Sequence, residues 1–134
     1  MLDHHRALIY TMVIVSAAER NLPDSELHAF VEIVGHLPIF EDFDKNELPG
    51  LFNDCIELMS RENGLEQTLT AIKAGLPPKL RETAYAIACD LVATDREATQ
   101  EELRILELLR HRLKIERLTA AAIERAARAR FQTL

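Results

Sequence analysis

The sequence predicts an all-α protein, a single bundle of about seven helices. Apolar residues recur at the three-and-four spacing of a helix along the whole chain, and no convincing run shows the period-two alternation of a strand. Hydrophobic residues make up 48% and charged residues 28% of the 134 residues, the balance of a folded globular protein. This length suits one domain with a sizeable core, so we expect a single domain over residues 1–134.

Two of the predicted helices, over residues 3–18 and 79–93, are apolar on nearly all sides and should lie at the centre of the bundle. Asp3 can cap the first of them. A helix over about residues 23–35 follows the first, and Gly35 suits its C-terminal cap.

The remaining helices are expected at about residues 49–61, 65–75, 99–113 and 119–131. Asn63-Gly64 breaks the first two apart, and Thr99 with Glu102 forms a capping box at the start of the third. In the last helix, one face is apolar and the opposite face carries Arg125 and Arg128. The apolar face either closes the bundle or builds a dimer interface, and it consists of Ala120, Ile123, Ala127 and Phe131.

Nothing in the sequence indicates a membrane span or an oxidising compartment. The longest apolar stretch, residues 7–18, is shorter than the roughly 20 residues that a bilayer requires, and no signal-peptide cleavage site follows it. Cys55 and Cys89 lie in apolar helical contexts with no metal-ligand spacing, which predicts buried thiols. We therefore expect a cytoplasmic protein.

Charge is distributed unevenly along the chain, whose net charge is −6. Residues 104–134 hold eight Lys/Arg against three Asp/Glu, a balance of +5, so the rest of the chain carries −11. This distribution argues against general nucleic-acid binding, which requires a broad basic face. The basic end is either a solvated surface or a docking surface for an acidic protein partner, a second copy in a homodimer, or a peripherally contacted anionic membrane.

The most informative pattern is an internal repeat at an offset of 76 residues, with units of about residues 5–40 and 81–116. Residues 17–27 align with residues 93–103, with Ala, Arg, Glu and Leu identical at four positions. The apolar phase continues downstream, and each loop follows a strongly apolar helix. This predicts a pseudo-twofold arrangement of two helix–acidic loop–helix units.

Within these units the loops carry an acid seven residues before a glutamate, Glu19 before Glu26 and Asp95 before Glu102. In this spacing the chain resembles the TerB-like (tellurite-resistance B) superfamily, to which the N-terminal region of membrane-anchored DnaJ-like co-chaperones is also similar. The resemblance covers about residues 5–115 and implies a helical, non-enzymatic module associated with the response to tellurite or oxidative stress. Arg20 and Arg96 stand where the family usually has glycine.

The acidic loops suggest a divalent-cation site. Oxygen ligands in this spacing suit Ca²⁺ or Mg²⁺, although neither loop has the full ligand pattern of an EF-hand. The candidate ligands are Asp95, Glu97 and Glu102 in the second loop and Glu19 and Glu26 in the first. The alternative is structural, because Glu26 and Glu102 lie at helix N-termini, where acids are favoured by capping and by the helix dipole.

Catalytic patterns are missing from the sequence. The five histidines have no paired-ligand spacing, no nucleophile stands beside a recognisable base, and no glycine-rich phosphate loop is present. Asp90, in a strongly apolar helix, should need a partner such as Arg96, Arg20 or a loop amide. Two functions remain: a TerB-like stress-associated interaction module, or a divalent-cation sensor that uses the loops at residues 19–26 and 95–102.

Overall fold

The computed structural model describes residues 2–18, 24–94 and 98–134, and the side chains of residues 24–27 lie outside that description. Within these ranges the chain is helical, without strands, which confirms the all-α prediction. The α-helices are α1 (His4–Ala17), α2 (Asp24–His36), α3 (Leu48–Met59), α4 (Gly64–Gly75), α5 (Arg81–Thr94), α6 (Gln100–Arg112) and α7 (Arg117–Arg130). Short 3-10 turns occur at Pro38–Phe40, Lys45–Glu47 and Pro78–Leu80.

The helix boundaries support the predicted repeat. Helix α6 begins and ends 76 residues after α2, and α5 begins and ends 77 residues after α1. The packing is reciprocal as well, because α1 contacts α6 while α5 contacts α2. The α-helix that follows each unit also packs on the central helix of that unit, α3 on α1 and α7 on α5. Helix α4 lies between α3 and the second unit in the chain.

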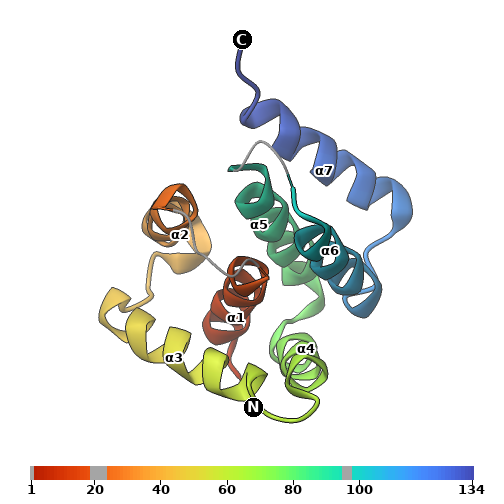
Figure 1. Ribbon diagram of the computed structural model, residues 1–134. Coiled ribbons are helices and arrows are strands. Elements are labelled where there is room, and N and C mark those ends of the chain that lie inside the picture. Colours follow the sequence, from red (N-terminus) through yellow and green to blue (C-terminus); the bar gives the residue numbers. More distant parts are fainter. Residues whose placement is uncertain (1, 19–23, 95–97) are drawn as a thin grey trace.

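Helices α1 and α5 contact each other and lie in the middle of the bundle, as predicted (Figure 1). Every residue of α1 from Ala7 to Ser16 is buried, and Asp3 caps the helix by accepting the Arg6 amide hydrogen at 2.9 Å. Thr11 satisfies its buried hydroxyl locally by donating to the Ala7 carbonyl at 2.9 Å. None of the helices in the described ranges has the length and apolar character needed to cross a bilayer.

Two helix ends differ from the sequence-based expectation. Helix α2 continues through Gly35 to His36, and no described glycine has the positive φ that a left-handed cap requires, so Gly35 is a helical residue here. Helix α7 begins at Arg117, earlier than expected, because the Glu116 carboxylate caps it by accepting the Thr119 amide hydrogen at 3.1 Å. Asn63, with φ of 56°, makes the predicted break between α3 and α4.

Helix α7 closes the bundle with its apolar face. Ala120 and Ala127 are buried against α5, whereas Phe131 at the end of this face stays partly exposed. Both cysteines are buried, Cys55 in α3 and Cys89 in α5, as the sequence predicts. The packing of α7 on α5 therefore buries Ala120 and Ala127 in the core. Of the two interpretations of this apolar face, closing the bundle is the one that this packing supports.

Candidate functional site

The structure describes only part of the predicted acidic loops. Asp95, Glu97 and Glu19 lie outside the described residues, and Glu26 lies in α2 with its side chain outside them. Glu102 is therefore the one predicted ligand whose side chain can be placed. Among the described residues, no three His, Cys, Asp or Glu side chains gather as a metal-binding group.

Glu102 is fully buried and forms the capping box that the sequence predicts. Its Oε1 atom accepts the Thr99 amide hydrogen at 3.0 Å, and its own amide donates to the Thr99 hydroxyl at 3.1 Å. The second carboxylate oxygen, Oε2, is buried and has no hydrogen-bond partner among the described residues. One oxygen of this carboxylate thus caps helix α6, and the other is a buried acceptor without a described donor.

Asp90 has a different partner from those expected. Its carboxylate pairs with Arg130 of α7, and its side chain is 27% exposed rather than deeply buried. The expected partners Arg20 and Arg96 lie outside the described residues. Asp90 thus has the partner that its apolar helix requires, and this partner is Arg130 because α7 packs along α5 and brings its last turn beside Asp90. This ion pair joins the end of α7 to the central helix.

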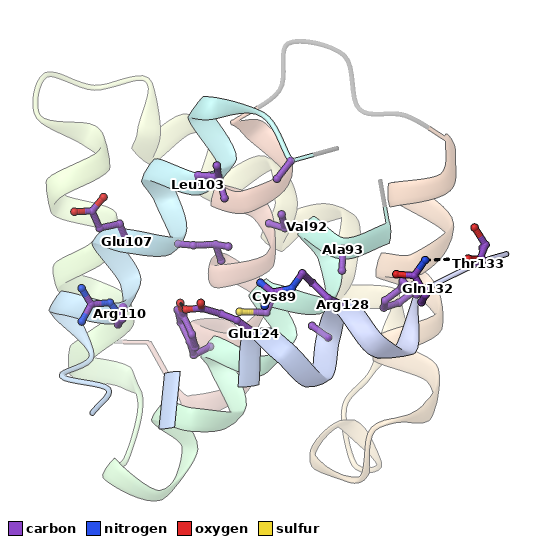
Figure 2. A pocket seen from close by; sticks show the side chains of 15 residues that line it. Cys89, Val92, Ala93, Leu103, Glu107, Arg110, Glu124, Arg128, Gln132 and Thr133 are labelled. Carbon is purple, nitrogen blue, oxygen red and sulfur yellow. Dashed lines mark hydrogen bonds between the residues drawn. The ribbon is translucent and has the colours of Figure 1, made fainter. Parts of the chain in front are cut away.

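A groove with a volume of about 470 Å³ lies between α5, α6 and α7 (Figure 2). We call it the α5–α6–α7 groove. Its lining is mainly apolar, and two large apolar side chains of this lining are exposed, Leu103 at 49% and Phe131 at 39%. The other apolar lining residues are Cys89, Val92, Ala93, Ala98, Leu106 and Ala127.

A few polar side chains converge on this groove. The Tyr85 hydroxyl donates to Glu124 Oε2 at 2.6 Å, which ties α5 to α7 beneath the groove. Arg128 of α7 extends towards Cys89, and Glu107 and Arg110 line the α6 side (Figure 2). Neither Arg110 nor Arg128 forms an ion pair with a described carboxylate.

Two titratable groups at the groove floor, Cys89 and Tyr85, have raised pKa values. Burial raises the pKa of the Cys89 thiol to about 12, so the thiol stays protonated and a poor nucleophile at neutral pH. Burial, with the hydrogen bond to Glu124, also raises the pKa of Tyr85 well above its usual value. Neither group is tuned towards the neutral pKa that acid–base catalysis favours.

Sequence reasoning named the components of this groove without assembling them. It placed Phe131 and Ala127 on the apolar face of the last helix, and it expected Cys89 in the core. It missed the Tyr85–Glu124 hydrogen bond and the exposure of Leu103. Both depend on how helices distant in the sequence pack against one another, α7 on α5 in the first case and the neighbours of α6 in the second. The repeat gave no signal for the exposure of Leu103, because its place in the apolar phase predicts a buried side chain.

Comparison with known proteins gives one match. The sequence model of the family described as "Tellurite resistance protein TerB" matches residues 5–127. The chain belongs to the TerB family. No curated protein and no solved structure matches the chain. The TerB match spans both repeat units and reaches into α7, so α5, α6 and most of the groove lie inside the matched region. TerB domains are in general helical and non-catalytic.

Proposed function

We propose that this TerB-family chain is a non-enzymatic, stress-associated interaction module that binds a helical segment of a partner protein in the α5–α6–α7 groove. The observation that carries the proposal is the groove itself, an apolar hollow of about 470 Å³ with Leu103 and Phe131 exposed at its edges. Exposed apolar hollows of this kind on a folded domain mark binding surfaces. An amphipathic helix in an apolar groove is a recurring mode of protein recognition.

Charge narrows the chemistry of the partner. Residues 104–134, which form most of α6 and all of α7, carry eight basic and three acidic residues. Two acids and two arginines line the groove. Glu124 is held by Tyr85, while Glu107, Arg110 and Arg128 have no ion-pair partner among the described residues. The segment that fits is an amphipathic helix with acidic residues beside its apolar face.

The link to stress rests on the family alone. The printed description of the matching family names tellurite resistance, and we extend it to this chain as part of the proposal. Growth of the native host in tellurite or peroxide, with the wild-type chain or a groove variant, tests that link. Loss of tolerance with a groove variant that still folds supports it, and unchanged tolerance when the whole chain is deleted contradicts it.

Site-specific photocrosslinking in the native host tests the groove directly. A photoreactive phenylalanine analogue at Leu103, inside the groove, is compared with the same analogue at Leu118, which is 77% exposed on α7 and does not line the groove. We expect a partner that crosslinks from position 103 only, through a segment that is amphipathic and acidic when sequenced by mass spectrometry. Equal crosslinking from both positions, or a crosslink to a second copy of this chain, contradicts the proposed partner.

A divalent-cation sensor remains the second candidate function, and one observation favours it. Glu102 Oε2 is buried without a described partner, at the start of the helix that follows the predicted ligands Asp95 and Glu97. A cation held by this loop, Ca²⁺ or Mg²⁺, neutralises such an oxygen. Pairing with a loop arginine such as Arg96 is the structural alternative.

Thermal unfolding in EDTA and then in millimolar Ca²⁺, Mg²⁺ or Mn²⁺ separates these possibilities, because a metal that binds only the folded chain raises the midpoint. The variant Asp95→Asn with Glu97→Gln removes ligands and leaves the capping box of Glu102 in place. Glu101→Gln, an exposed neighbour in the first turn of α6, serves as the matched control. A shift that persists in the loop variant, or no shift with any ion, rules out the sensor.

A further inference from the structure

A second hollow, remote from the acidic loops, is lined by three basic side chains. It has a volume of about 590 Å³ and lies where the end of α4, the start of α5 and the end of α6 meet. Lys73, Arg81 and Arg112 line it, one from each of these helices, and none of its lining residues is an aspartate or a glutamate. We call it the basic hollow. Its composition is unusual in a chain with a net charge of −6.

Most of this positive charge lacks a described counterion. Arg112 pairs with Glu66 of α4, but neither Lys73 nor Arg81 forms an ion pair with a described carboxylate. The Nε atom of Arg81 is also buried without an acceptor among the described residues. A charged donor without a partner is costly where it is buried, which makes the unpaired charge of Arg81 unfavourable. The two terminal guanidinium nitrogens of Arg81 have no described acceptor and are not buried, so an anion in the hollow can reach them.

The helix directions sharpen the argument for Arg81. Arg81 is the first residue of α5, at the positive end of the helix dipole, where a cation is disfavoured and an anion is favoured. Lys73 lies in the last turn of α4 and Arg112 in the last turn of α6, where a cation suits the dipole, so helix stabilisation accounts for these two residues. It does not explain why Arg81 lies beside them in the same hollow.

We propose that the basic hollow binds a phosphoryl group, with Arg81 and Lys73 as its principal donors and Arg112 as a third cation. A guanidinium presents several donors in a planar fork that matches phosphate oxygens, and a lysine adds a point charge. Inorganic phosphate or a phosphate monoester carries about −1.5 to −2 charges at neutral pH, enough to neutralise the two unpaired cations, and a phosphodiester headgroup carries a single negative charge. This site is separate from the α5–α6–α7 groove, with which it shares no lining residue.

Amide chemical shifts and thermal midpoints in inorganic phosphate, compared with chloride at equal ionic strength, provide the primary test. We expect phosphate to raise the midpoint and to shift resonances around residues 69–81 and 112, with binding that weakens as salt screens the charges. Lys73→Gln and Arg81→Gln should each weaken phosphate binding about tenfold or more, since each removes a charge-assisted contact. Circular dichroism of each variant checks that it is folded.

Lys79→Gln is the matched control. Lys79 is an exposed cation two residues before Arg81 and does not line the hollow, so phosphate binding should be unchanged in this variant. If Lys79→Gln weakens binding as much as Lys73→Gln does, or if phosphate and chloride act alike, the proposal is overturned. If one of the variants Lys73→Gln and Arg81→Gln fails to fold, the other is sufficient to test the site.

The phosphoryl group has two candidate sources, which a third set of measurements distinguishes. Glycerol phosphate represents a soluble phosphate ester, and vesicles of phosphatidylglycerol in phosphatidylcholine represent a membrane headgroup. A soluble source predicts binding of glycerol phosphate without co-sedimentation with vesicles. A headgroup source predicts co-sedimentation with the anionic vesicles that Lys73→Gln and Arg81→Gln reduce and Lys79→Gln does not. Co-sedimentation that is indifferent to all three substitutions, together with no binding of either soluble anion, contradicts the site.

Discussion

Helices α1 and α5 hold corresponding places in the repeat, have the same length, and serve different purposes. Helix α1 is buried without interruption from Ala7 to Ser16, enclosed by neighbours that include α3, α4, α5 and α6. Along α5, the partly exposed positions Ala86, Asp90 and Ala93 recur at the spacing of one helix face. Another part of α5, with Tyr85 and Cys89, forms the floor of the α5–α6–α7 groove.

This difference shows how a duplicated architecture can separate stability from binding. One copy of the central helix contributes ten consecutive side chains to the core, Ala7 to Ser16. The other contributes buried side chains such as Tyr85 and Cys89 to the floor of a groove and leaves Ala86, Asp90 and Ala93 partly exposed. The polar groups follow the same division. Helix α1 uses its cap Asp3 and the local hydrogen bond of Thr11, whereas α5 uses Tyr85 and Asp90 to hold α7 in position.

The largest contrast should appear in the core of the first unit. Leu8→Ala removes a fully buried side chain from α1 and should lower the free energy of unfolding by about 2–5 kcal/mol, because it removes buried apolar surface and leaves a cavity. Leu103→Ala, at the exposed edge of the groove, should change it by about 0.5 kcal/mol or less. Urea unfolding followed by circular dichroism measures both. Equal losses in the two variants contradict the division between core and groove.

The sequence predicted what depends on local pattern. The all-round apolar character of residues 7–18, the capping box of Thr99 and Glu102, and the break at Asn63 are all local signals, and the structure confirms them. The repeat also predicted that α2 and α6 correspond, and the two helices indeed lie 76 residues apart in the sequence.

What could not be predicted depends on how distant helices lie against one another. Asp90 pairs with Arg130, 40 residues away, and Lys73 meets Arg81 and Arg112 only because α4, α5 and α6 converge. No spacing along the chain encodes these meetings. The width of the groove is a further property of packing, since it follows from where α7 crosses α5.

The two thiols allow the same comparison through pH. Burial raises the pKa of Cys55, in the first unit, and of Cys89, in the second, to about 12 each, against about 9 when exposed. The unfolded thiols therefore lose their protons above pH 9 while the folded ones keep them, so stability present below pH 9 is lost as pH rises towards 12. From pH 8 to pH 10, each thiol should contribute a loss of about 1.4 kcal/mol.

Urea unfolding at both pH values measures this loss, with Cys55→Ala and Cys89→Ala each compared with the wild type. Each variant should show a smaller decrease between pH 8 and pH 10, and the two reductions should be similar because burial is the leading cause at both sites. If only Cys55→Ala reduces the loss of unfolding free energy between pH 8 and pH 10, the folded Cys89 thiol does not have a raised pKa. That result would show that the groove admits water to Cys89. If both variants lose as much unfolding free energy between pH 8 and pH 10 as the wild type does, titratable groups other than the two thiols cause the loss.

A smaller effect is expected at the start of α6, where the two units differ in sequence. Thr99 accepts the Glu102 amide hydrogen, but its counterpart in the repeat is Pro23, whose side chain has no acceptor. Thr99→Ala should cost about 1 kcal/mol of unfolding free energy, and Thr99→Ser should restore most of it. Thermal unfolding without added metal is the measurement. Failure of serine to restore stability would show that the hydroxyl is not the stabilising group.

The smallest effect concerns the ion pair between Asp90 and Arg130, which joins α7 to α5. The Asp90 side chain is 27% and that of Arg130 52% exposed, so water and salt screen their attraction, and the pair should contribute about 0.5 kcal/mol. A double-mutant cycle with Asp90→Asn and Arg130→Gln, measured at low salt and in 0.5 M NaCl, isolates the interaction energy. An interaction energy above about 1 kcal/mol that resists salt would mean that this pair, more than the packing of Ala120 and Ala127, fixes α7 on α5 and thereby sets the width of the groove.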